Sequence, residues 1–160
     1  MIPHAIVPER FIYREKKQDF VLFLGHLTHG KGLHIAIEAC RLACKQTMQA
    51  GHQGAPRLVV AGTHHGPESD ELLELGRKAL GSAFEYVGFA DYWKRRELLA
   101  DAKALIYPTP ALEPFGYTVL EANVSGTPAL VSDWGALTET VENGVNGFRC
   151  RDSATLAEAV

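Results

Sequence analysis

Two glutamates, Glu113 and Glu121, lie on either side of a proline–glycine turn. Pro114-Phe115-Gly116 predicts a sharp turn, and a helix is expected to begin near Gly116 and continue through Tyr117-Thr118-Val119. The first N–H groups of a helix are unpaired and carry partial positive charge, so they bind anions such as phosphate. Glycine lets a ligand approach the backbone, and carboxylates accept hydrogen bonds from sugar hydroxyls. A phosphate site flanked by two acids suits a sugar nucleotide.

The same residues also allow a structural interpretation. Thr118 and Glu121 match a capping box, in which a Thr side chain and an acid three positions later satisfy the N–H groups at a helix start. Glu113 would then be a solvated loop residue. Spacing alone leaves both interpretations open.

The loop from Gly25 to Gly32 is a second candidate for chemistry. Gly25, Gly30 and Lys31 match G-x-x-x-x-G-K, the start of a loop that binds nucleoside triphosphates, between a predicted strand and a predicted helix. That pattern next requires Ser or Thr, whose hydroxyl binds Mg²⁺, and this chain has Gly32 instead. A triphosphatase is therefore an alternative that lacks one of its ligands.

Histidines gather in two of the predicted loops. His26 and His29 follow the first strand, and His64 and His65 follow the second. Imidazole is a common metal ligand, so four such side chains that met in space would be able to hold a metal ion. Separate polar loop residues are the simpler interpretation, and we expect no metal site.

Strand-length apolar runs alternate with stretches of helical periodicity along the chain. Continuous apolar runs are expected of strands buried on both faces of a parallel sheet. The alternation predicts a Rossmann-like α/β domain, an open parallel sheet with helices on both faces, whose site loops meet at the carboxyl ends of the strands. We expect strands at 20–25, 57–62, 84–88, 104–107 and 128–132, an extended piece at 147–150, and helices at 33–48 (ended by Gly51 and Gly54), 69–80, 96–103, 117–125 and 137–142, with a final helix after Asp152.

The turn at residues 113–116 is where the chain resembles a known family. Glu-Pro-Phe-Gly at 113–116, Glu121 followed by Ala, and Gly-Thr-Pro at 126–128 resemble the signature of retaining GT-B glycosyltransferases of family 4, or glycosyltransferase group 1. The resemblance covers nearly the whole chain. It implies that residues 1–160 are one donor-binding domain, the C-terminal half of a GT-B fold. Residues 1–18 are then an interdomain lead-in, and the N-terminal acceptor domain is expected to lie outside this chain.

The resemblance also implies roles for individual residues. Glu113 is expected to contact the transferred sugar, and Glu121 the ribose hydroxyls. Related enzymes hold the donor diphosphate with an Arg and a Lys in the loop that begins at Gly25. Lys31 matches the Lys, and His26 stands where the Arg is expected. A neutral His lacks the fixed charge and the planar fork of Arg.

The implied reaction is glycosyl transfer with retention, from a UDP-, GDP- or ADP-sugar and without a cofactor or metal. The isolated chain is expected to bind nucleotide weakly and not to turn over. A non-catalytic nucleotide-binding module is a further alternative, suggested by His26. The expected catalytic residues are Glu113, Lys31 and His26, and the expected donor-binding residues are Gly25, Lys31, Val87, Phe89, Phe115, Gly116, Tyr117, Thr118, Val119 and Glu121.

Two side-chain clusters near residue 94 are given structural interpretations. The basic run Lys94-Arg95-Arg96 is interpreted as a solvated helix face. Tyr92 and Trp93 are interpreted as packing residues and not as a stacking platform for a ligand.

Composition limits the classes of protein that remain. A length of 160 residues suits one domain, and 46% hydrophobic with 22% charged residues is ordinary for a globular chain. A net charge of −3 argues against nucleic-acid binding, which needs a basic surface. The chain shows no apolar run long enough to span a bilayer and no signal-peptide pattern, so membrane contact is not indicated. The cysteines, Cys40, Cys44 and Cys150, suggest no disulfide framework, so we expect a reducing, cytoplasmic setting.

Overall fold

The computed structural model describes residues 5–50 and 56–160. In this part of the chain, a six-stranded sheet has the order β3-β2-β1-β4-β5-β6, and neighbouring strands are parallel throughout. The predicted fold class, an open parallel Rossmann-like sheet, is confirmed. The strands are β1 (Val21–Leu24), β2 (Leu58–Ala61), β3 (Phe84–Tyr86), β4 (Ala104–Tyr107), β5 (Ala129–Ser132) and β6 (Gly147–Cys150).

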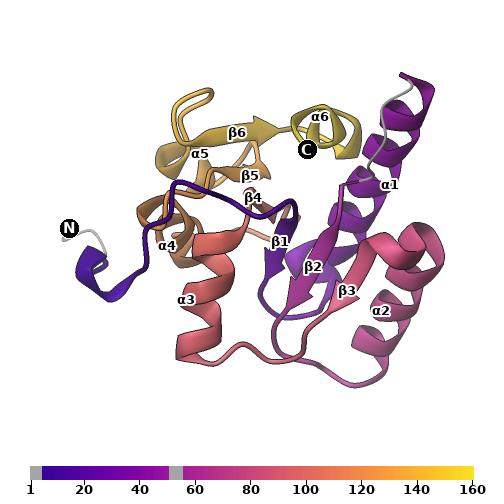
Figure 1. Cartoon of the computed structure of the whole chain (residues 1–160), viewed down its shortest axis with the longest axis horizontal. Helices are drawn as coiled ribbons and strands as arrows, with labels where there is room; N and C mark the ends of the chain where they lie inside the picture. Colours follow the sequence, from indigo (N-terminus) through magenta and orange to yellow (C-terminus); the bar gives the residue numbers. More distant parts are fainter. Residues whose placement is uncertain (1–4, 51–55) are drawn as a thin grey trace.

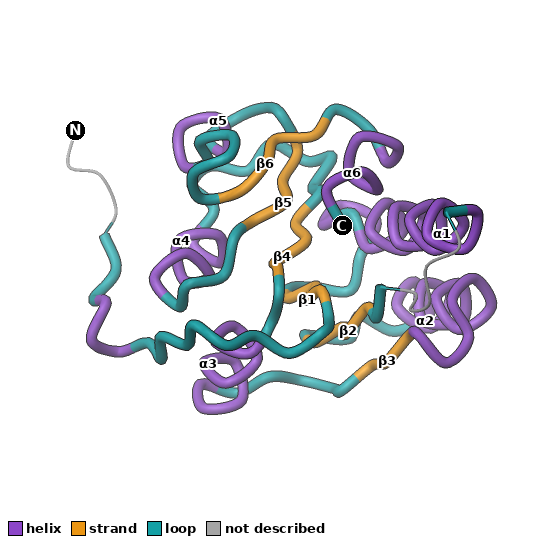
Figure 2. The backbone as a smooth tube through the Cα atoms, turned by 45° about the horizontal axis from the view of Figure 1, so that its top comes forward, coloured by secondary structure: helices purple, strands orange, loops and turns teal. Residues whose placement is uncertain are grey.

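Helices cover both faces of the sheet. Figure 2 shows α1, α2 and α6 on one side and α3, α4 and α5 on the other. The helices are α1 (Leu33–Gln49), α2 (Pro67–Leu80), α3 (Tyr92–Asp101), α4 (Tyr117–Val124), α5 (Leu137–Thr140) and α6 (Ser153–Ala159), with short 3₁₀ helices η1 (Pro8–Arg10), η2 (His29–Lys31) and η3 (Gly81–Ala83).

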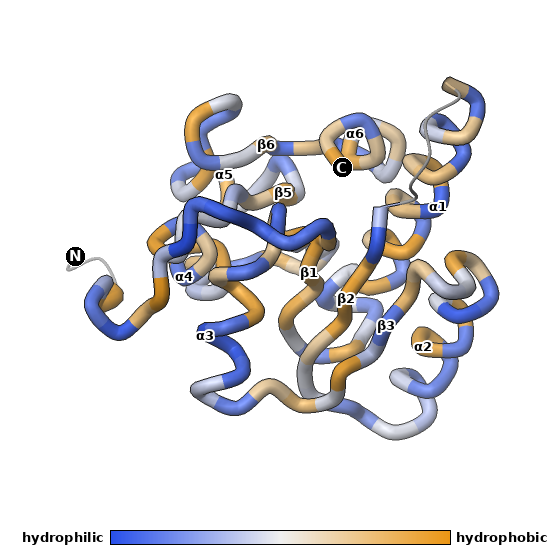
Figure 3. The backbone as a smooth tube through the Cα atoms, viewed as in Figure 1, coloured by the Kyte–Doolittle hydropathy of each residue, from blue (hydrophilic) through white to orange (hydrophobic). Residues whose placement is uncertain are grey.

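The central strands are apolar at every position because each contributes to two cores. In β1, Val21 and Phe23 pack in the layer with α1, α2 and α6, whereas Leu22 and Leu24 pack in the layer with α3 and α4. Successive side chains of a strand point to opposite faces, so both sets are buried. Hydrophobic colour accordingly concentrates on the central strands in Figure 3.

Two elements differ most from the sequence prediction. The helix α3 begins at Tyr92 and not at residue 96, because the side chain of Asp91 caps it by accepting a hydrogen bond from the N–H of Lys94. Residues 147–150, expected only to be extended, form a sixth strand that pairs with β5. The predicted end of α1 at Gly51 and Gly54 lies outside the described residues.

Residues 5–18, predicted as a lead-in, pack against the domain. Figure 1 shows this indigo segment passing α4 and α3 before it enters β1. Lys17 anchors it, because its ammonium group donates to acceptors from two helix ends. Burial lowers the pKa of Lys17, although Asp101 acts to raise it. The acceptors are the carbonyl oxygens of Ala100 (2.8 Å) and Ser125 (2.9 Å) and the hydroxyl of Thr127 (2.9 Å).

The cysteines take no part in a covalent link. Cys40, Cys44 and Cys150 are free thiols. Burial raises the pKa of Cys40 to about 12 and that of Cys150 to about 11, so both are protonated at neutral pH. Across residues 5–50 and 56–160, every helix is too short or too polar to cross a bilayer.

Candidate functional site

The order of the strands marks one place on the sheet. From β1 the chain adds β2 and β3 on one side, and from β4 it adds β5 and β6 on the other. Open parallel sheets bind ligands beyond the carboxyl ends of the strands at such a switch point. The loop after β1 carries Lys31, and the loop after β4 carries Glu113. Both predicted residues therefore lie at the switch point.

Lys31 and Glu113 contact each other directly. The Nζ of Lys31 lies 2.8 Å from Oε2 of Glu113 and donates to the hydroxyl of Tyr107 at 3.1 Å. That hydroxyl donates to the same carboxylate oxygen at 2.7 Å. The other oxygen, Oε1, accepts from the N–H of Gly116 at 3.1 Å. The Glu113 side chain is only 10% exposed, so it is a carboxylate held firmly at the start of α4.

These hydrogen bonds set the charges of the three side chains. Burial acts to raise the pKa of Glu113 and to lower that of Lys31, but the hydrogen bonds between them and to Tyr107 outweigh it. The pKa of Glu113 is therefore lowered and that of Lys31 raised. Burial, reinforced by Glu113, raises the pKa of Tyr107 to about 12. At neutral pH the group contains a carboxylate, an ammonium and a neutral phenol. Glu113 can then accept hydrogen bonds from hydroxyls but cannot donate a proton.

The conformation of Gly116 brings its N–H back onto Glu113. Gly116 is the N-cap residue of α4 and has φ +85°. This left-handed region favours glycine, and a Cβ here would also lie 3.0 Å from the side chain of Leu137. The predicted sharp turn before α4 is therefore present.

Glu121, on α4, is held by a different cation. Arg95 of α3 donates from Nε to Oε2 of Glu121 at 2.6 Å, and its Nη2 also contacts that oxygen. Nη2 donates as well to the hydroxyl of Thr118 at 3.2 Å. The capping-box interpretation is wrong, because Gly116 is the N-cap residue and no side chain caps it.

Arg95 is a site residue that the sequence patterns do not indicate. Its side chain is 31% exposed and ion-paired, so the interpretation of the whole basic run as a solvated face is wrong at this position. The only sequence signal was the basic run itself, which did not single out one member.

Val87 and Phe89, two of the expected donor-binding residues, follow β3. The N–H of Val87 donates to the carbonyl of Val60 at 3.0 Å, and its own carbonyl accepts from the ammonium of Lys94. Both backbone groups of Val87 are therefore occupied. Phe89, whose side chain is 68% exposed, is the more accessible of the two predicted positions.

The aromatic residues at the start of α3 are not core residues. Trp93 is 67% exposed and Tyr92 is 50% exposed, so their interpretation as packing residues is wrong. The guanidinium of Arg96 lies 5.2 Å from the centroid of each of the two rings. These contacts are local to the surface of α3.

The loop histidines separate into different pairs. The Nδ1 of His26 lies 2.5 Å from Nε2 of His65, and the two rings stack with centroids 4.7 Å apart. His29 and His64 pair instead with acidic side chains of α2. In the part of the chain that the structure describes, no group of three or more His, Cys, Asp or Glu residues is placed to hold a metal ion.

The loop after β1 does not have the form of a triphosphate-binding loop. The 3₁₀ helix η2 interrupts it, and Gly32 adopts φ +79° against the carbonyl of Pro108. The ammonium of Lys31 is directed to Glu113 on another loop. This geometry gives no support to the triphosphatase alternative.

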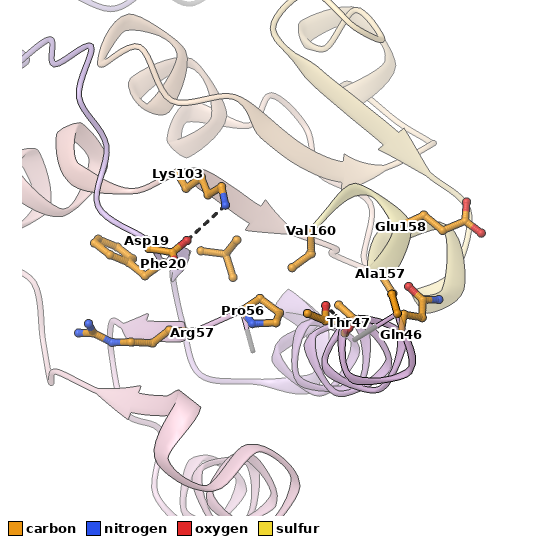
Figure 4. Close-up of a pocket in the computed structure, with 13 residues that line it drawn as sticks. Asp19, Phe20, Gln46, Thr47, Pro56, Arg57, Lys103, Ala157, Glu158 and Val160 are labelled. Atoms are coloured by element: carbon orange, nitrogen blue, oxygen red, sulfur yellow. Dashed lines mark hydrogen bonds and ion pairs between the residues drawn. The ribbon is translucent and has the colours of Figure 1, made fainter. Parts of the chain in front are cut away.

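A cavity of about 590 Å³ lies at the opposite, amino-terminal edge of the sheet. Figure 4 shows Asp19, Arg57 and Lys103, which precede β1, β2 and β4, around it. Lys103 and Asp19 form an ion pair of 3.2 Å there. No predicted site residue lines this cavity. Because ligands of open parallel sheets bind at the carboxyl edge, the candidate site is the one at Lys31 and Glu113.

The parallel sheet, with a charged pair at its switch point, makes the chain an open α/β domain of the Rossmann-like class. Residues 8–160 match the family model described as glycosyl transferases group 1, and the chain belongs to that family. Glycogen synthase of Mycobacterium tuberculosis (strain H37Rv) is 38% identical over 143 residues, which are 88% of this chain and 32% of that protein. A GDP-mannose-dependent alpha-(1-6)-phosphatidylinositol dimannoside mannosyltransferase of M. tuberculosis (strain H37Ra) is 34% identical over 125 residues, 78% of this chain and 30% of that protein. The chain thus spans about a third of the length of these curated relatives.

Solved structures agree with this family. HepE of Anabaena, crystallised with UDP and glucose, superposes with a TM-score of 0.71 at 27% identity and covers 88% of this chain and 37% of its own. AviGT4, a glycosyltransferase involved in avilamycin A biosynthesis, superposes with a TM-score of 0.72 at 30% identity. The match covers 99% of this chain and 47% of the AviGT4 chain. The C-terminal domain of a group 1 glycosyl transferase from Francisella tularensis superposes with a TM-score of 0.76, over 96% of this chain and 85% of its own. Because the identity is 19%, this match supports the fold alone. The prediction of a C-terminal GT-B domain of glycosyltransferase group 1 is confirmed.

Proposed function

We propose that this chain binds a nucleoside diphosphate sugar and serves in glycosyl transfer with retention at the anomeric carbon. The observation that carries the proposal is the contact between Lys31 and Glu113 at the switch point of the sheet. Membership of glycosyltransferase group 1 and the UDP and glucose named for the HepE structure support the choice of ligand class.

The diphosphate of the donor binds at the start of α4 beside Lys31. Negative charge grows on the leaving diphosphate as the glycosidic bond breaks. A fixed ammonium and the N–H groups of a helix start stabilise that charge without reorganising. Lys31 is suited to this role because its contacts keep it protonated at neutral pH. The proposal therefore assigns no cofactor to the step.

Glu113 orients the transferred sugar. It is ionised. Its Oε2 already accepts from Lys31 and Tyr107, so Oε1, which accepts from the N–H of Gly116, is the oxygen assigned to a sugar hydroxyl. Sugar hydroxyls are donors that such oxygens accept. Because Tyr107 and Lys31 fix the carboxylate, the sugar meets an acceptor already in place.

Glu121, His26 and Phe89 complete the proposed donor site. Glu121 accepts hydrogen bonds from the ribose hydroxyls. His26 contacts the diphosphate, and the segment at Phe89 contacts the base. The predicted backbone contacts along 116–119 belong to the same site.

The acceptor is proposed to be held by another domain. In support, the chain spans about a third of its curated relatives. The isolated 160 residues should therefore bind nucleotide weakly and leave the donor intact.

Calorimetric or saturation-transfer titration with UDP, GDP and ADP and their sugars tests the proposal. We expect one base to be preferred, with a Kd of about 10 μM to 1 mM. No binding by any of them would overturn the proposed function. Donor consumption by the isolated chain would refute the need for a second domain. Binding of UDP, GDP or ADP without binding of the corresponding nucleotide sugar would favour the non-catalytic module.

A further inference from the structure

The contact between Arg95 and Glu121 has an unusual form. Both Nε and Nη2 of Arg95 converge on the single oxygen Oε2, while Nη2 also reaches the hydroxyl of Thr118. A fork-to-fork pair would instead cover both carboxylate oxygens. Here the guanidinium holds one edge of the carboxylate and leaves Oε1 outside the fork. Glu121 is 16% exposed, so its carboxylate is confined and not free to turn into solvent.

This arrangement fixes the direction in which Glu121 can accept further hydrogen bonds. Two donors hold Oε2 between α3 and α4, and the bond from Nη2 to Thr118 holds the guanidinium against α4. A carboxylate that is ionised and fixed in direction recognises a pair of neighbouring hydroxyls better than one that rotates, because no orientation has to be lost on binding. Removing the cation would leave a largely buried carboxylate unpaired and free to rotate.

We propose that Arg95 is a positioning residue that makes Glu121 selective for an intact ribose. The chain would distinguish a ribonucleoside diphosphate from its 2′-deoxy form through this pair. The inference rests on the proposed function, since it assumes that Glu121 meets the ribose. A purely structural tie between α3 and α4 would stabilise the fold but would not discriminate between these two ligands.

The test measures a ratio of affinities. The preferred nucleoside diphosphate among UDP, GDP and ADP and its 2′-deoxy form are titrated against wild type, Arg95→Ala and Arg95→Lys. We expect wild type to favour the ribose form about 10-fold or more, as a hydrogen bond to a charged group allows. Arg95→Ala should reduce the preference to less than about 3-fold, mainly by weakening the ribose form. Arg95→Lys keeps the positive charge but lacks the planar guanidinium, so its ribose preference should lie between those of wild type and Arg95→Ala.

Arg41→Ala is a matched control. Arg41 also donates from Nε and Nη2 to a glutamate, Glu38, and both residues lie on α1, on the other face of the sheet from α3 and α4. Its loss should leave the ratio unchanged. If Arg95→Ala does not fold, Arg95→Met keeps the length of the side chain and replaces it in the test.

The outcomes separate the two proposals. An unchanged ribose preference in a folded Arg95 variant, or an equal loss for both ligands, overturns the positioning role while the proposed function stands. Absence of binding to wild type overturns the proposed function and this inference with it. A ratio that collapses only in the Arg95 variants supports the assignment.

Discussion

The ammonium of Lys31 lies 2.8 Å from a carboxylate oxygen of Glu113, although 82 positions separate the two residues in the sequence. The contact joins the loop after β1 to the loop after β4, and Tyr107 bonds to both partners. Since Glu113 is largely buried, removing one charge leaves the other without its partner. The same pair therefore bears on ligand binding and on stability.

Loss of Lys31 should weaken binding of the diphosphate. We expect Lys31→Ala to raise the Kd for the preferred nucleoside diphosphate about 10- to 100-fold, because a charged hydrogen bond of about 1.5–3 kcal/mol is lost. Calorimetry gives the affinity. Lys78→Ala, on the exposed surface of α2, is the control and should bind as wild type does. Equal affinity in wild type and Lys31→Ala would remove Lys31 from the site.

The pair should also make stability depend on pH. The pKa of Glu113 is lowered in the folded state, so its contribution is complete above the ordinary value of 4.5 and is lost as the pH falls through the lowered pKa. The pKa of Lys31 is raised, so its contribution is complete below 10.5 and is lost as the pH rises through the raised pKa.

Urea unfolding of wild type and Glu113→Gln measures how much the Glu113 carboxylate contributes to stability at neutral and acidic pH. We expect wild type to be more stable by about 1–3 kcal/mol at pH 7, and the difference to shrink as the pH falls below about 4.5. A difference that stays constant from pH 7 to pH 3 would show that the carboxylate charge contributes nothing.

Substitutions of Glu121 and of Glu113 should have different effects on the binding of a nucleoside diphosphate that lacks the transferred sugar. Glu121 is assigned to the ribose, which every nucleoside diphosphate contains, and Glu113 to the transferred sugar. Glu121→Ala should therefore weaken binding of the free nucleotide about 10-fold, and Glu113→Ala less than about 3-fold. The opposite ranking in titrations with the free nucleotide would reverse the two roles.

Replacing His26 by Arg should strengthen diphosphate binding. His26 is exposed, so a longer side chain fits, and Arg adds a fixed charge and a fork. We expect His26→Arg to lower the Kd about 3- to 10-fold. His64→Arg adds the same charge beside Asp70 and is the control. No gain from His26→Arg would place residue 26 away from the diphosphate.

The two glycines of η2 and its cap should respond differently to substitution. Gly32 has φ +79°, and a Cβ there would lie 2.1 Å from the carbonyl oxygen of Pro108. Gly32→Ala should cost about 2–4 kcal/mol in the free energy of unfolding. A Cβ added at Gly30 would lie 3.8 Å from Thr28 Oγ1, an ordinary contact, so Gly30→Ala should cost less than about 1 kcal/mol. Similar denaturation midpoints for both variants would contradict this account of Gly32.

Local sequence patterns predicted the elements well because their causes are local. The apolar run at 20–25 became β1 since each of its side chains enters one of two cores. The start of α3 was missed because a single side chain, Asp91, decides it.

Side-chain pairs across the sheet were not predictable in the same way. The contact between Lys31 and Tyr107 depends on β4 lying next to β1, and no local pattern encodes that order. Likewise, Arg95 is one of three adjacent basic residues, and only the packing of α3 beside α4 selects it as the partner of Glu121.

The anchoring of Lys17 has a practical consequence for protein engineering. Its three acceptors lie where α3 and α4 terminate, so a version trimmed to begin at the first strand would strip those carbonyl groups of their donor. The smallest fragment that keeps the ends of α3 and α4 tied together must therefore include residues before β1 as well as the sheet and its helices. Any shortened form of the protein should retain the segment that carries Lys17.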